Sequence, residues 1–390
     1  MVKTIPLKDL CVMDITDGTH KTPTYADSGY IFLSSKNVTS GTIDWENVMY
    51  IPEALHNELY RRIAPRRNDI LLAKNGTTGV AAIVDRDEVF DIYVSLALIR
   101  PDEEKVLPKY LLHAINSYPT KQFFDSHLKG IGVPNLHLTH IRETPVKVPS
   151  FDEQRRIADV LDKINSLLFI RKQQLTKLDE LVKARFVELF GTPLLNEKGW
   201  GVKNTGDVCS VTDGSHFSPV GKEEGYPMLS VRNMRNDGFH YDDCKLVSQE
   251  DYDVLVKQGC KPLKNDVLIA KDGSYFYYGF VVKEEIEQAV LSSIAILRPN
   301  LELINPEYLC RYMLSSEIVD LVGKNYVTGA AIKRVILKGI KQIPVMLPPI
   351  ELQNQFAAFV EQTDKSKLAI QKSLDELETL KKALMQKYFG

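Results

Sequence analysis

The chain has 390 residues and a formal net charge of −2, with 44% hydrophobic and 26% charged residues. This length suggests two or three domains, and the nearly neutral charge argues against a nonspecific nucleic-acid coat, which is normally basic. No run of about 18 apolar residues occurs and the N-terminal segment has no apolar core, so neither a transmembrane helix nor a signal peptide is expected. Five widely spaced cysteines without a CxxC pair disfavour zinc ribbons and disulfide frameworks, and they fit a cytoplasmic location.

Residues 1–149 alternate short apolar runs with Gly, Asn, Asp and Pro turns, which is typical of a compact α+β domain. The runs DILLAK (69–74) and VSLALIRP (94–101) are predicted to be buried strands. The segment YLLHAINS (110–117) follows Pro108 and is predicted to be a short helix.

A long helix is predicted over residues 150–191. It begins with acidic residues in its first turn, and proline and glycine are absent as far as Phe190. Along this helix, apolar residues recur at steps that alternate between four and three, which is the pattern of a coiled-coil seam. Arg171 and Arg185 interrupt the seam.

The second half of the chain repeats the first, with a domain predicted at 192–348 and a second helix at 349–390. The seam of the second helix is strongly apolar where the first is interrupted, so we expect the two helices to pair as an antiparallel coiled coil with pseudo-two-fold symmetry. Two independent surface helices are the alternative. The repeated motifs are Asp17-Gly18-Thr19-His20 with Asp213-Gly214-Ser215-His216, Asn68-Asp69 to Gly76 with Asn265-Asp266 to Gly273, Ser95 to Pro101 with Ser293 to Pro299, and Phe190-Gly191 with Phe389-Gly390.

Taken together, these features resemble the specificity subunit of type I restriction–modification systems. The resemblance covers essentially the whole chain and rests on the duplicated order of a DG(T/S)H motif, an NDxLxAK(N/D)G motif and a proline-led entry to each long helix. It implies two tandem α/β target-recognition domains, each reading one half of a split, asymmetric target on double-stranded DNA. It also implies that the helices act as spacers and dock two methyltransferase subunits, through which restriction–translocase subunits join.

Motifs for catalysis are missing from the sequence. Asn305-Pro306-Glu307-Tyr308 resembles the NPPY motif of adenine methyltransferases but lacks the second proline, and its counterpart at 107–110 lacks the asparagine, so both are predicted to be helix starts. A glycine-rich cofactor loop and HExxH are also absent. We therefore expect no catalytic, cofactor or metal site in this chain, and S-adenosylmethionine, ATP and Mg on partner subunits. A coiled-coil protein scaffold and a stand-alone methyltransferase or nuclease are the alternatives.

Candidate DNA contacts lie in the repeated loops. Lysine suits phosphate, whereas Asn, Thr and Tyr suit phosphates or base edges. Replacing Lys74 or Lys271 is expected to weaken DNA binding. The slope of log affinity against log salt concentration should fall by about 0.9 for each lost phosphate contact. An ordinary turn is the alternative for each loop, and the loops 130–135 and 329–334 differ sharply in chemistry, which suits either different half-sites or drift. The predicted DNA-binding residues are His20, Lys21, Lys36, Asn37, Lys74, Asn75, Thr77, Thr78, Asn135, Ser215, His216, Arg232, Asn233, Lys271, Asp272, Ser274, Tyr275, Lys333 and Arg334.

Overall fold

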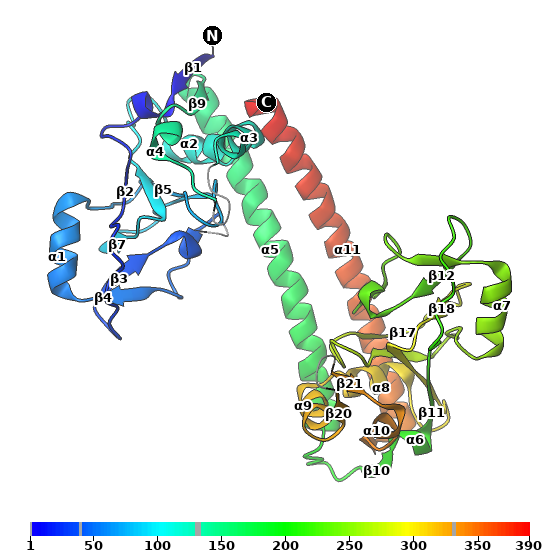
Figure 1. Ribbon diagram of the computed structural model, residues 1–390. Helices are drawn as coiled ribbons and strands as arrows, with labels where there is room; N and C mark the ends of the chain where they lie inside the picture. The colour runs from blue at the N-terminus through cyan, green and yellow to red at the C-terminus, as the bar shows by residue number, and fades with distance from the viewer. Residues whose placement is uncertain (1, 39–40, 129–133, 330–332) are drawn as a thin grey trace. The chain divides into compact units, whose positions relative to one another are not determined.

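The structure, a computed structural model, describes residues 2–38, 41–128, 134–329 and 333–390 (Figure 1). The chain divides into two compact units. Unit 1 contains Met1–Gln173 and Gln371–Gly390, and unit 2 contains Gln174–Ile370. Each unit therefore combines one globular domain, the first part of the long helix that follows it, and a part of the other long helix.

The domain of unit 1 is built on two small sheets. The first has the strand order β2-β8-β5-β6 with antiparallel neighbours, and the second has the order β4-β3-β7, in which β3 and β7 are parallel. A separate antiparallel pair joins β1 to β9. The elements are β1 (Lys3–Pro6), η1 (Leu7–Leu10), β2 (Thr16–Asp17), β3 (Tyr30–Leu33), η2 (Ser35–Val38), β4 (Met49–Ile51), α1 (Glu53–Arg62), β5 (Ile70–Ala73), β6 (Ala81–Ile83), β7 (Phe90–Ile92), β8 (Leu96–Ile99), α2 (Pro108–Ile115), α3 (Tyr118–Ser126), α4 (Leu138–Arg142) and β9 (Pro145–Val148).

The domain of unit 2 repeats this plan, with strand orders β11-β19-β16-β17 and β15-β12-β18 and a pair β10-β22. The predicted duplication of an α+β domain is thus confirmed. The elements are β10 (Gly201–Asn204), α6 (Thr205–Val208), β11 (Cys209–Asp213), β12 (Tyr226–Leu229), η3 (Val231–Asn233), β13 (Met234–Arg235), β14 (Gly238–Phe239), β15 (Lys245–Val247), α7 (Gln249–Lys257), β16 (Val267–Ala270), β17 (Gly279–Val281), β18 (Ala289–Val290), β19 (Ile294–Pro299), α8 (Pro306–Met313), α9 (Ser316–Asn325), β20 (Val327–Thr328), β21 (Arg334–Val335), α10 (Leu337–Lys341) and β22 (Pro344–Leu347).

The repeated Asn-Asp pair begins the central strand of each domain. Asn68 has a φ of 71° and Asn265 a φ of 72°, a backbone region that asparagine tolerates better than most residues. The adjoining Asp69 is buried and accepts two hydrogen bonds from the Arg100 guanidinium, at 2.8 and 2.7 Å. Asp266 and Arg298 form the same pair in unit 2. The NDxL and Arg-Pro repeats therefore have a structural role. In each domain the aspartate before one strand binds the arginine after the neighbouring strand.

The two long helices are α5 (Phe151–Phe190) and α11 (Ile350–Phe389), as predicted. A buried glutamine ties the start of each helix to its own domain. Gln154 Oε1 accepts the Leu107 N–H at 2.8 Å, and Gln353 Oε1 accepts the Asn305 N–H at 2.9 Å. None of the described helices is long and apolar enough to cross a membrane.

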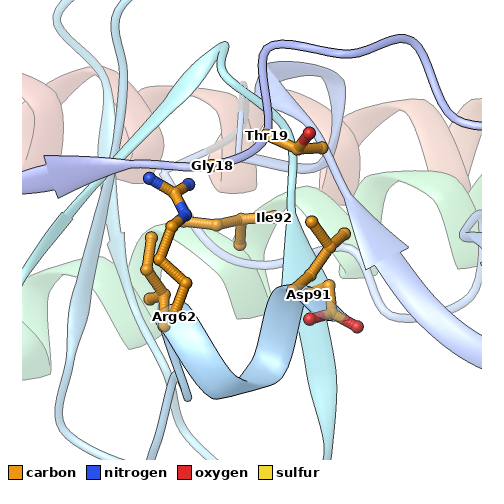
Figure 2. Close-up of a pocket in the computed structure, with 7 residues that line it drawn as sticks. Gly18, Thr19, Arg62, Asp91 and Ile92 are labelled. Atoms are coloured by element: carbon orange, nitrogen blue, oxygen red, sulfur yellow. The ribbon is translucent and has the colours of Figure 1, made fainter. Parts of the chain in front are cut away.

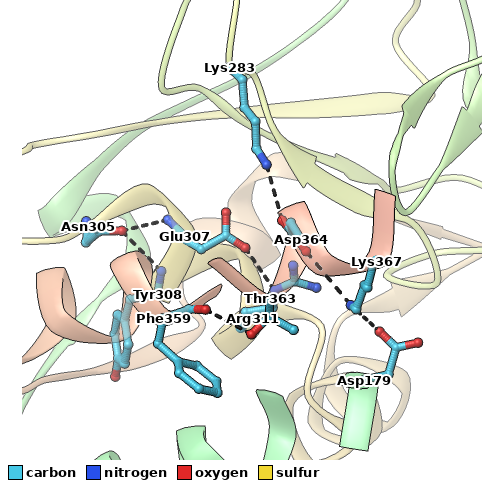
Figure 3. A network of polar contacts seen from close by, with 10 residues as sticks. All are labelled: Asp179, Lys283, Asn305, Glu307, Tyr308, Arg311, Phe359, Thr363, Asp364 and Lys367. Atoms are coloured by element: carbon cyan, nitrogen blue, oxygen red, sulfur yellow. Dashed lines mark hydrogen bonds and ion pairs between the residues drawn. The ribbon is translucent and has the colours of Figure 1, made fainter. Parts of the chain in front are cut away.

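Within each unit the two long helices run antiparallel. In unit 1 the ammonium of Lys172 lies 3.8 Å from the carboxylate of Glu378, and the guanidinium of Arg156 lies 5.8 Å from the ring of Tyr388. Unit 2 pairs Lys367 with Asp179 at 2.5 Å (Figure 3). In the same unit, the guanidinium of Arg185 lies 6.0 Å from the Phe359 ring. Arg185, one of the two arginines that interrupt the seam, thus lies beside an aromatic ring of the facing helix, and these contacts confirm the predicted antiparallel pairing.

The phenylalanine near the end of each long helix is buried in a domain core. Phe389 lies in the core of unit 1, with its ring centroid 5.6 Å from that of Tyr110. Phe190 lies in the core of unit 2, 4.7 Å from Tyr308. The repeated phenylalanine therefore anchors the last turn of α11 in the core of unit 1 and the last turn of α5 in the core of unit 2.

Candidate nucleic-acid interface

Two loops that are distant in sequence lie side by side in each domain. In unit 1, the backbone N–H of Leu136 donates to the carbonyl of Lys74 at 2.8 Å, and the N–H of Gly76 donates to the carbonyl of Pro134 at 3.2 Å. Residues 134–136 thus extend the end of β5. The equivalent bonds in unit 2 run from Val335 to Lys271 (2.9 Å) and from Gly273 to Lys333 (2.7 Å). The remaining residues of these predicted loops, 130–133 and 330–332, lie outside the described residues, apart from Gly329.

The lysines that follow the central strands lie in internal ion pairs. Lys74 Nζ pairs with Asp17 at 3.1 Å, and only 7% of its side chain is exposed. Lys271 pairs with Asp213 at 3.3 Å and has the same small exposure. A buried ammonium that is already paired with a carboxylate is not presented to a DNA phosphate. These ion pairs join the two repeated motifs, and they argue against the predicted phosphate contacts of Lys74 and Lys271, which a DNA-binding experiment must test.

Three other predicted DNA contacts are engaged in local turns. Asn37 is buried, and its side chain accepts the Ser34 N–H at 2.9 Å while donating to the carbonyl of Asn47 at 3.1 Å. Asn233 repeats the first of these bonds in unit 2. Ser215 is buried and donates to the carbonyl of Phe217 at 2.7 Å. For these residues the structure favours the alternative of an ordinary turn.

The glycine of the DG(T/S)H motif is required by close packing. A Cβ on Gly18 would lie 1.9 Å from the carbonyl oxygen of Ile92, and one on Gly214 would lie 2.0 Å from that of Val290. No heavy atoms approach so closely, so only glycine fits. The histidine two residues later is exposed in both motifs, with His20 and His216 each 3.3 Å from the motif aspartate.

A small pocket beside this motif in unit 1 was not anticipated from the sequence (Figure 2). Arg62 borders it and donates to the carbonyl of Asp17 at 2.7 Å, so this arginine supports the backbone of the motif. Asp91 also borders it, and burial raises the pKa of its carboxyl group while a contact of 2.7 Å with His56 opposes this shift. The pocket has a volume of about 10 Å³, which is room for about one water molecule. It is too small for an organic ligand.

The described residues contain no group of three or more His, Cys, Asp or Glu side chains that could hold a metal ion.

The two domains share one scaffold, and the same internal Lys–Asp ion pair occurs in both. A family model for the type I restriction modification DNA specificity domain matches residues 2–180 and 197–380, which is most of the chain. The chain belongs to the type I restriction–modification DNA specificity family.

Curated relatives of this family span most of the chain. The putative type I restriction enzyme MjaX specificity subunit of Methanocaldococcus jannaschii is 22% identical over 376 residues, covering 92% of this chain and 85% of the relative. The EcoBI specificity subunit of Escherichia coli is 21% identical over 322 residues, covering 75% and 67%.

Solved structures show the same fold. The S subunit of the type I restriction–modification system from M. genitalium superposes with a TM-score of 0.60 at 15% identity, covering 100% of this chain and 96% of that one. A chain from a structural study of complex assembly and conformational transition in a type I system gives 0.54 at 18% identity, covering 100% and 97%. DNA sequence recognition in restriction–modification is the role of the specificity family.

The predicted DNA-binding residues differ in the solvent exposure of their side chains. Fully buried side chains serve the scaffold, whereas exposed ones remain available to DNA. The half-buried candidates are Asn75, Thr78, Asn135, Asn233, Asp272 and Tyr275. The exposed candidates are His20, Lys21, Lys36, Thr77, His216, Arg232, Ser274, Lys333 and Arg334.

Proposed function

We propose that the chain reads a bipartite, asymmetric target on double-stranded DNA, with one half-site for each domain. The observation that supports this is a common scaffold with unlike surfaces. Strand order and the buried Lys–Asp pair are the same in both domains. At equivalent exposed positions, however, Lys21 in unit 1 is replaced by Phe217 in unit 2. Two different surfaces on one scaffold are what the reading of two different sequences requires.

In this proposal the chain directs chemistry that other subunits perform. Its own residues supply recognition, while two methyltransferase subunits and the restriction–translocase subunits carry S-adenosylmethionine, ATP and Mg. The lack of a complete NPPY motif and of a glycine-rich cofactor loop in the sequence supports this division of roles. The Asn305 side chain, which begins the one similar motif, instead caps α8 by accepting the N–H of Glu307 at 2.8 Å (Figure 3).

Methylome sequencing tests the proposed function. In a host that expresses this chain with its methyltransferase subunit, the methylated motif should consist of two short, different sequences separated by a fixed, unspecified gap. A host with the methyltransferase subunit alone is the control and should lack the motif. A continuous motif would contradict the two-domain reading. If the chain methylates DNA without its partner, then the chain is itself an enzyme. If the methylated motif is the same in the host without the chain, then the chain does not read DNA and serves as a scaffold.

Exposed apolar side chains on α5 support docking of a partner subunit. In unit 1, Leu167, Phe169 and Ile170 are 44%, 61% and 47% exposed. Leu167 and Ile170 are three residues apart and so lie on the same side of the helix. A surface helix normally presents polar residues to solvent, and adjacent exposed apolar side chains are typical of an interface.

Changing Phe169 and Ile170 together to aspartate should abolish co-purification of the methyltransferase subunit with this chain. Loss of a buried aromatic anchor at an interface costs at least about 2 kcal/mol, or roughly 30-fold in affinity. The matched control is Arg155→Asp, which changes the charge by the same two units at an exposed position of the same helix, about four turns away from Phe169. Equal co-purification of the double variant and the control, with circular dichroism unchanged, would place the docking surface elsewhere.

A further inference from the structure

The side-by-side loops place one pair of residues at the same position in each domain. Asn75 and Asn135 form an isolated antiparallel bridge in unit 1, and Asp272 and Arg334 form the equivalent bridge in unit 2. The bridge is held on one side by the backbone bond between 136 and 74, and in unit 2 by the bond between 335 and 271. The backbone hydrogen bonds beside the bridge are therefore equivalent in the two domains, whereas the side chains of the bridge differ.

In unit 2 the bridge carries a chain of charges. The guanidinium of Arg334 lies 3.8 Å from the carboxylate of Asp272, which lies 3.5 Å from the ammonium of Lys271. Lys271 in turn pairs with Asp213. Only 16% of the Asp272 side chain is exposed, whereas 53% of the Arg334 side chain is exposed. An exposed guanidinium thus lies within ion-pair distance of Asp272, which itself lies beside a buried ion pair.

In unit 1 the same bridge is uncharged and directed inward. Asn75 and Asn135 are both half-buried, and their Oδ1 atoms are buried without a hydrogen-bond partner among the residues that the structure describes. An amide pair of this kind offers no charged fork to a ligand. At this equivalent position the first domain therefore has an uncharged amide pair, and the second domain has a charged pair with an exposed guanidinium.

We propose that Arg334, paired with Asp272, is a specificity-determining residue that selects a guanine in the half-site read by the second domain. This inference rests on the proposed function. The planar guanidinium donates two parallel hydrogen bonds, which match the O6 and N7 acceptors of guanine in the major groove. Methionine has an unbranched side chain without any hydrogen-bond donor, so it cannot make this contact. The first domain has no such selectivity at its equivalent position.

The test uses the purified complex of this chain with its methyltransferase subunits and duplexes that carry the motif found by methylome sequencing. Each guanine of the second half-site is replaced in turn by adenine, with the complementary base changed. One replacement should weaken binding by the wild type about 5- to 150-fold, the range of one bidentate base contact. Replacing that guanine by 7-deazaguanine, which lacks the N7 acceptor, should also weaken binding.

In the Arg334→Met complex both effects should vanish at that position, while every base preference in the first half-site is retained. The control Lys338→Gln removes an exposed charge from nearby α10 and should leave the preference for guanine intact. Retained guanine preference in Arg334→Met, or a second half-site without guanine, overturns the inference and leaves the proposed function standing. A continuous or absent wild-type motif overturns the proposed function itself.

Discussion

Replacing Lys74 by methionine should destabilise the first domain by about 3–5 kcal/mol, because it leaves the buried Asp17 carboxylate without its lysine partner and with only the exposed His20 side chain beside it. The side chains of both residues are less than 10% exposed, so water cannot readily solvate the orphaned charge. Native-state hydrogen exchange of the β5 amides measures the change in unit 1, since a whole-chain melting curve would mix the two units.

The double variant Asp17→Asn with Lys74→Met is the matched control. It removes both charges, so much of the lost stability should return and the double-mutant cycle should show strong coupling. The salt dependence of DNA binding should be the same in the wild type and in the folded double variant. A log–log slope lower by about 0.9 would instead return Lys74 to the DNA, as the sequence-based hypothesis held.

Phe190→Ala should destabilise unit 2 by about 3–5 kcal/mol, which is the usual effect of removing a buried aromatic ring. The ring is fully buried, with centroids 4.7 Å from Tyr308 and 5.5 Å from Phe356. Hydrogen exchange should quicken in β16 and β19 and stay unchanged in β5 and β8, because Phe190 belongs to the core of unit 2.

Val187→Ala is the control for this experiment, since Val187 lies on the last turn of the same helix but is 47% exposed. Its effect should stay within about 0.5 kcal/mol, as for most surface substitutions. If the two variants have equal effects, then Phe190 does not anchor the helix end in the domain core.

Short-range patterns were sufficient to predict the elements. The strands β5 and β8 appear as apolar runs bounded by turn residues, and the helices α5 and α11 appear as long stretches without proline or glycine. The duplication of motifs predicted two equivalent domains, and the alternating seam predicted that the helices pair. Each of these inferences depends on residues that are close in sequence or on spacing alone, which is why the printed sequence contains them.

The roles of individual polar residues were decided by the tertiary structure. The sequence alone determined that Lys74 and Lys271 end buried strands within a repeated motif, a position where a lysine is as suitable for phosphate as for an internal ion pair. Folding brings the aspartate of a motif that is distant in the chain within 3.1 Å of Lys74, and burial of the pair makes it structural. The Asp272–Arg334 bridge arises in the same way, from two loops that only the fold places side by side. Contacts between segments far apart in a chain depend on how the strands pack, and no local pattern encodes them.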